Sequence, residues 1–234
     1  MANIYIIDNL RLNKSGLQIK DENGDWIDLH CQQGRLDGAC AVYSTIMALL
    51  CMGVLSEADI QIMTKPDRRT KKGKFLYHLF EQQGLIRSGY YLDRMAEEIQ
   101  NFIPDYVVNY YRGDDAIQKT KNCIENGLPA IISVVNDNND LHHALLVIGM
   151  EFEGEEGKEK LLKLFCLDPG YGVSKTTPPF AFTYFIISFI SISKTFFIYF
   201  IYELPFLYRT FFCVHLCFLD DITTTDVALP LVSI

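Results

Sequence analysis

Residues 37–44, with the sequence DGACAVYS, open a segment with helical spacing. Small and apolar side chains recur every three or four positions in this segment, at Ala41, Ser44, Ala48 and Cys51. Asp37 and Gly38 come just before them, and both residue types are suited to cap a helix. The pattern therefore predicts a helix with Cys40 in its first turn.

Short strands are predicted before this helix. Apolar and polar residues alternate up to Leu17, and a second run extends from Gln18 to Leu29. The dipeptide Asn23-Gly24 divides the second run and is typical of the tight turn in a β-hairpin. We expect two or three short strands here.

Further helices and then further strands are predicted after it. Helices are expected over residues 75–83, 92–102 and 114–126. Apolar and β-branched runs predict buried strands over residues 130–135, 145–152 and 161–167. The order of strands, helices and strands indicates an α+β fold in which helices and sheet are segregated.

Composition narrows the class of protein. A chain of 234 residues can bury the core of one ordinary domain, and its net charge of -8 argues against nucleic acid as a partner. Seven cysteines without a C-x-x-C pair predict reduced thiols rather than a disulfide framework. Because the first residues do not resemble a signal peptide, we expect a cytoplasmic protein, with membrane association or non-classical export as alternatives.

Cys40 is the first candidate for a catalytic residue, as a nucleophile. The positive end of a helix stabilises a thiolate, which is the reactive form of cysteine. The amide of Gln33, a short distance upstream, could converge with the Cys40 backbone N–H on an oxyanion, and Gln32 is the adjacent alternative. A buried cysteine is otherwise most often a small apolar residue, and that reading suits Cys51.

A histidine and an aspartate follow at the ends of two predicted strands. His142 and His143 enter the strand at 145–152, and only one of them can face the thiol because neighbouring strand residues point to opposite sides. Asp168 ends the next strand before Pro-Gly, where it forms a turn or orients the histidine.

Taken in order, Gln33, Cys40 at a helix start, the run HALLVIG and the run LDPG resemble the papain superfamily of cysteine peptidases. They are most similar to bacterial bacteriocin-leader (double-glycine) peptidases and their stand-alone relatives. The resemblance covers residues 33–171 and implies a papain-like fold, with the helix of the nucleophile packed on an antiparallel sheet. It implies Cys40 as nucleophile, His143 as base, Asp168 as the orienting group and Gln33 in the oxyanion hole, without a cofactor.

The resemblance implies hydrolysis of a peptide or isopeptide bond through a thioester, with a peptide or protein as substrate. Two alternatives stay open: acyl transfer to an amine by the same triad, as in transglutaminases, and a non-catalytic, membrane-tethered interaction module. Two departures leave the leader substrate class open. The Gln33 to Cys40 spacing is one residue longer than in papain, and Ala41 stands where leader peptidases usually carry glycine.

Residues 180–234 form a hydrophobic tail that differs in composition from residues 1–179, the predicted catalytic domain. Extra strands, a membrane segment over residues 180–202 and a shifted reading frame are three interpretations of this tail. Lys194 counts against a spanning helix, since a charge near the bilayer centre is costly. Cys213, His215 and Cys217 lack a fourth metal ligand, so no metal site is expected. The oligomeric state is left open.

Overall fold

The computed structural model of the chain describes residues 2–13, 16–34, 38–61, 66–82, 92–112, 116–135, 142–155, 159–170, 194–203, 209–210 and 215–218.

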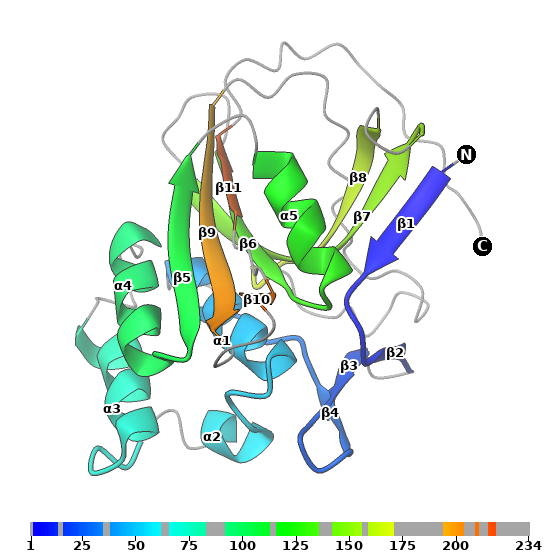
Figure 1. Cartoon of the computed structure of the whole chain (residues 1–234). Coiled ribbons are helices and arrows are strands. Elements are labelled where there is room, and N and C mark those ends of the chain that lie inside the picture. Colours follow the sequence, from blue (N-terminus) through cyan, green and yellow to red (C-terminus); the bar gives the residue numbers. More distant parts are fainter. Residues whose placement is uncertain are drawn as a thin grey trace.

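An antiparallel sheet forms the body of the protein (Figure 1). In the described ranges its strands are β1 (Ala2–Ile6), β5 (Tyr106–Arg112), β6 (Ala130–Val135), β7 (His142–Glu153), β8 (Lys160–Leu167), β9 (Lys194–Glu203), β10 (Arg209–Thr210) and β11 (His215–Phe218). Strand β7 pairs with β1, β6 and β8. Its apolar residues and those of β6 suit strands covered on both faces.

A second, three-stranded sheet lies near the N-terminus and consists of β2 (Leu10–Leu12), β3 (Leu17–Lys20) and β4 (Trp26–Asp28). The turn between β3 and β4 holds Asn23-Gly24, as predicted, and Gly24 has a φ of 88° that side chains rarely adopt. The Asp21 carboxylate accepts hydrogen bonds from the backbone N–H groups of Asn23 (2.9 Å) and Asp25 (2.8 Å). The predicted hairpin is therefore confirmed.

The helices are α1 (Cys40–Cys51), α2 (Glu57–Gln61), α3 (Lys71–Tyr77), α4 (Leu92–Phe102) and α5 (Ala116–Glu125), with a π-helical turn η1 (His78–Gln82) after α3. The prediction for residues 92–102 is confirmed. The prediction of a start at 75 is wrong, because the Thr70 side chain caps α3 by accepting from the Gly73 N–H at 2.9 Å. Helix α2 and strand β5 were not predicted.

The start of α1 also needs a correction. Its N-cap is Ala39, not Asp37 or Gly38, and no side chain caps it. Cys40 is consequently the first residue of the helix. The position of α1 is set by packing, because its central residues Ile46, Met47 and Leu49 are fully buried.

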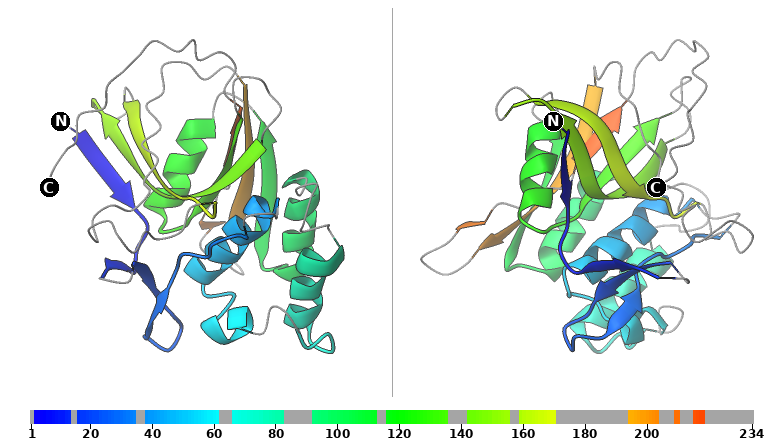
Figure 2. Two further views of the ribbon diagram at one scale, coloured as in Figure 1. Left: turned by 180° about the vertical axis from the view of Figure 1, so that it is seen from behind. Right: turned by 90° about the vertical axis from the view of Figure 1, so that its right-hand side faces the viewer.

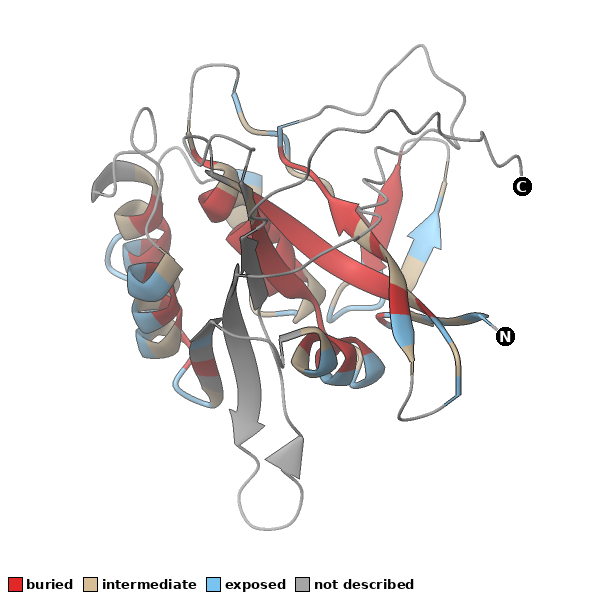
Figure 3. Cartoon of the chain, turned by 90° about the horizontal axis from the view of Figure 1, so that it is seen from above, coloured by how far each residue is buried: buried red, intermediate tan, exposed pale blue. Residues whose placement is uncertain are grey.

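Helices cover both faces of the main sheet. Helix α1 packs on β7 and β6, and α5 packs on β1, β7 and β11 from the opposite side (Figures 1 and 2). Buried residues are concentrated between α1 and the sheet and along β6 and β7 (Figure 3). The α+β class predicted from the sequence is confirmed.

The described parts of residues 180–234 are strands of the main sheet. Strand β9 pairs with β5 from Tyr106 opposite Tyr202 to Arg112 opposite Phe196, and it meets β6 where Ile132 lies opposite Phe197. Residues 180–193, the first part of the suggested membrane segment, lie outside the described ranges. No helix within the described ranges is long and apolar enough to span a bilayer.

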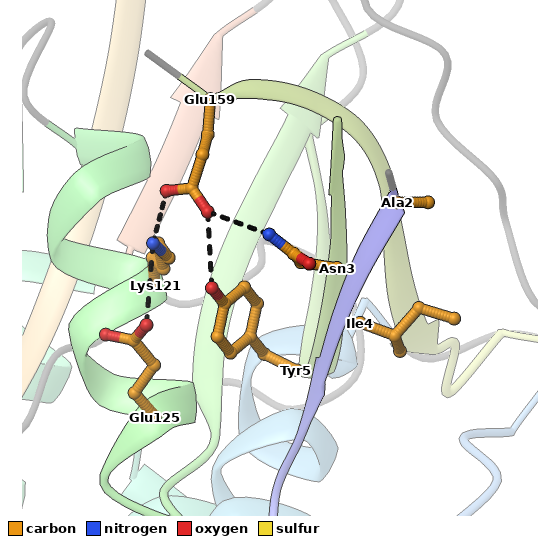
Figure 4. A pocket seen from close by; sticks show the side chains of 7 residues that line it. All are labelled: Ala2, Asn3, Ile4, Tyr5, Lys121, Glu125 and Glu159. Atoms are coloured by element: carbon orange, nitrogen blue, oxygen red, sulfur yellow. Dashed lines mark hydrogen bonds and ion pairs between the residues drawn. The ribbon is translucent and has the colours of Figure 1, made fainter. Parts of the chain in front are cut away.

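A buried polar cluster ties β1 to α5 and to the start of β8 (Figure 4). Lys121 of α5, with 7 % of its side chain exposed, forms ion pairs with Glu159 and, at 3.5 Å, with Glu125. Glu159 also accepts hydrogen bonds from Tyr5 (3.2 Å) and Asn3 (3.5 Å), beside a pocket of about 430 Å³. Burial opposes the charge on Lys121, but the hydrogen bonds and charges of Glu159, Tyr5 and Glu125 together outweigh burial and raise the pKa of Lys121.

We expect Lys121→Met to lower the thermal unfolding midpoint by roughly 5 °C or more, because it leaves Glu159 buried without its cation. The matched control is Lys163→Met. This change removes the 2.7 Å ion pair between Lys163 of β8 and Glu151 of β7. Lys163 is 37 % exposed, so this change should have little effect. Equal midpoints for the two variants in a calorimetric scan would show that the cluster adds no stability.

Candidate active site

Helix α1 carries Cys40 to the strand that carries His143. Ser44, one turn after Cys40, is fully buried and donates a hydrogen bond from its hydroxyl to the backbone oxygen of Ala144 at 3.2 Å. Ala144 directly follows His143 in β7. This contact fixes the first turn of α1 against the start of β7, which places the thiol and the imidazole on neighbouring elements.

The imidazole of His143 contacts the carboxylate of Asp168. His143 Nε2 lies 2.6 Å from Asp168 Oδ1, and the two side chains are 29 % and 2 % exposed. The antiparallel pairing of β7 and β8 explains this proximity, since Leu146 near the start of β7 lies opposite Leu167 at the end of β8. Asp168 follows Leu167 and therefore lies beside His143.

The surroundings of His143 favour its protonated form. Burial lowers its pKa, but the hydrogen bonds and charges of Asp168 and Cys40 outweigh burial and raise the pKa of His143 to about 9. Because Nε2 faces Asp168, Nδ1 is the nitrogen left to interact with Cys40. His143 thus interacts with both Cys40 and the buried carboxylate of Asp168.

Asp168 is held by a second donor. The backbone N–H of Gly170 donates to the same Oδ1 at 2.6 Å. A Cβ at Gly170 would lie 3.0 Å from Asp168 Oδ1 and 3.3 Å from His143 Cε1. A larger residue at position 170 would therefore push against the paired side chains of Asp168 and His143.

Gln33 lies beside the Asp168 turn. Its backbone N–H donates to the carbonyl of Pro169 at 2.8 Å, and its side-chain oxygen is buried without a hydrogen-bond partner among the described residues. A buried polar group left without a partner is costly, and such groups often mark functional positions. Gln32, the alternative, is exposed. The structure joins Gln33 to the turn that holds Asp168.

The structure gives less support to the other candidate residues, which are His142, the other cysteines and the suggested metal ligands. Asp168 pairs with His143, and the side chain of His142 is not among those described. Burial raises the pKa of Cys31 to about 11, and it also raises the pKa values of Cys51 and Cys123, so these thiols stay protonated near neutral pH. Cys213 lies outside the described ranges, in which no group of three or more side chains could hold a metal ion.

Ser44 and Gly170 were not predicted as parts of the site. Ser44 looked like one more small residue on the buried face of a helix, and only its partner Ala144, 100 positions away, gives it a role. Gly170 was recognised as a turn residue through the Pro-Gly pair. Nothing in the local pattern showed that the turn would pack against His143.

Comparisons with known proteins do not place the chain: no family model, no curated protein and no solved structure matches it.

We expect Gly170→Ala to slow the alkylation of Cys40 by iodoacetamide at pH 6 by about tenfold or more. The added methyl group displaces the Asp168 carboxylate or the His143 ring, which weakens the imidazolium that stabilises the thiolate. Mass spectrometry of peptides gives the rate at each cysteine. Gly53→Asn is the control, because Gly53 faces open space and asparagine tolerates its φ of 67°. An unchanged rate in Gly170→Ala would show that the close approach is unimportant.

Proposed function

We propose that this chain is a cysteine peptidase of papain-like type that hydrolyses a peptide or isopeptide bond through a thioester on Cys40. One observation carries the proposal: His143 contacts the buried carboxylate of Asp168 at 2.6 Å and also interacts with the Cys40 thiol. This is the geometry in which a base is oriented by a third group and serves a nucleophile. An α+β body with α1 on an antiparallel sheet supports the same proposal.

The first half of the proposed reaction forms the acyl-enzyme. The Cys40 thiolate attacks the carbonyl carbon of the scissile bond, and the π electron pair of that carbonyl moves onto oxygen. The C–N bond then breaks as His143 gives its Nδ1 proton to the departing amine, and a thioester remains. Asp168 accepts a hydrogen bond from the Nε2–H group throughout and so keeps the ring in one orientation.

The second half releases the acid. Neutral His143 takes a proton from water through Nδ1, and the resulting hydroxide attacks the thioester carbon. The C–S bond breaks, the thiolate of Cys40 leaves and the imidazolium is restored. The cycle starts again from the ion pair that the raised pKa of His143 favours.

The negative oxygen formed in both halves needs hydrogen-bond donors. The backbone N–H of Cys40 lies at the uncapped start of α1, where the helix dipole favours negative charge. We assign the second donor to the side-chain amide of Gln33. Gln33 lies on the segment joined to the Asp168 turn, and its side-chain NH₂ group is a donor that would bond to the negative oxygen only during the reaction.

The proposal is tested with p-nitrophenyl acetate, whose attack by a thiolate releases coloured p-nitrophenolate and leaves an acetyl thioester. We expect intact-mass and peptide analysis to locate the acetyl group on Cys40, with nitrophenolate released in a burst followed by slower turnover. Cys40→Ala should abolish the burst, whereas Cys51→Ala should retain it. Acetylation elsewhere, or no acetylation, would contradict the proposal.

The same experiment separates hydrolysis from acyl transfer. With glycinamide present, a hydrolase still yields mainly acetate, whereas an acyltransferase yields mainly acetylglycinamide. Predominant acetylglycinamide would replace the peptidase proposal by acyl transfer on the same triad. Binding of peptides without any acylation would instead support a non-catalytic module.

A further inference from the structure

We propose that His30 is a positioning residue of this site, which holds the backbone of Asp168 so that the carboxylate faces His143. The inference rests on the proposed function. His30 Nε2 lies 2.8 Å from the backbone oxygen of Asp168, although the two residues are 138 positions apart. Because a carbonyl oxygen only accepts, Nε2 must carry the hydrogen, and both the cation and one neutral tautomer of the ring provide it.

The turn at Asp168 needs such support because it lies beyond the last strand pair. The described pairing of β8 with β7 ends at Leu167 opposite Leu146. Pro169 has no backbone N–H, so this residue cannot donate to a neighbouring strand. A carboxylate on an unsupported turn would not keep the close spacing that orientation of an imidazole requires.

Residues 30–33 form hydrogen bonds with the Asp168 turn, beyond the end of the β7–β8 pairing. His30 donates to the carbonyl of Asp168, and the backbone N–H of Gln33 donates to the carbonyl of Pro169, each at 2.8 Å. This segment is itself anchored one residue earlier, since the Leu29 N–H donates to the Leu17 carbonyl at 3.0 Å and Leu29 is fully buried. The Asp168 turn is therefore braced against the N-terminal sheet.

Residues 30–33 also lie close in sequence to the other residues of the proposed reaction. This segment contains Gln33, and seven residues after Gln33 the chain reaches Cys40. The contact of His30 therefore joins the carboxylate side of the site to the loop that precedes the nucleophile. Its loss should move the Asp168 carboxylate away from His143 Nε2 rather than unfold the protein.

A positioning role predicts a change that a purely structural role does not. If the carboxylate moves away, His143 loses the partner that favours its protonated form. In His30→Asn we expect the pH midpoint of the His143 ring, followed by NMR of ¹⁵N-labelled histidine, to move down from about 9 toward 6.5. Among the described residues, the titratable groups that act on this ring are Asp168 and Cys40, and the variant leaves both in place.

Asparagine and glutamine make a matched pair. The amide nitrogen of glutamine can occupy the place of Nε2, whereas that of asparagine falls short by one carbon. We expect His30→Asn to slow acetylation of Cys40 by p-nitrophenyl acetate by about tenfold to a hundredfold. His30→Gln should restore both this rate and the His143 midpoint, and thermal unfolding of both variants reports any general loss of stability.

Two results would overturn the inference. The first is a His143 midpoint that stays at the wild-type value in His30→Asn, and the second is an equal loss in the asparagine and glutamine variants that follows their unfolding temperatures. The NMR readout needs no activity. If the wild-type protein is not acetylated at Cys40, the proposed function fails, while the effect of His30 on His143 is still measured.

Discussion

The hydrogen bond between His143 and Asp168 is the interaction on which the rest of the candidate site depends. It joins the start of β7 to the residue after β8, and among the interactions that raise the pKa of the His143 imidazole it is the largest. A buried carboxylate is unfavourable unless it is paired and hydrogen-bonded. Asp168 meets this condition with the His143 ring and the Gly170 N–H, so the contact is coupled to the folding of the β7–β8 hairpin.

The main sheet and helix α1 both help to hold the residues of this site in place. The sheet provides a rigid base, since β7 pairs with three strands and its apolar residues are buried. Helix α1 brings Cys40 to the same place through its buried face and through the bond from Ser44 to Ala144. On the far side of the sheet, the cluster around Lys121 ties α5 to β1 and completes the body. The site therefore lies where the sheet and helix α1 are in contact, and each of these elements is held by its own packing.

Much of this arrangement follows from local patterns in the sequence. Helical periodicity predicted the helix at 92–102, and an apolar, β-branched run predicted the strand at 130–135, both with the bounds that the structure has. Asn23-Gly24 predicted the hairpin. Strand β5 was missed because its partner β9 comes roughly 90 residues later, so no nearby hairpin signal marks it. The roles of Ser44 and His30 depend on partners 100 and 138 positions away. Lys121 belongs to an amphipathic helix, where a lysine is normally solvated, and only the tertiary fold buries it with Glu159.

The pH dependence of Cys40 alkylation reports on the proposed ion pair between Cys40 and His143. In the wild-type protein the rate at Cys40 should persist well below pH 8.5, the pKa of an ordinary thiol, because the His143 imidazolium stays protonated up to about pH 9 and stabilises the thiolate. His143→Ala should shift this profile to higher pH, and His142→Ala should leave it unchanged. A Cys40 that reacts no faster than Cys51 at pH 6, or a profile that only the His142 change moves, would contradict the ion pair at the centre of the proposed mechanism.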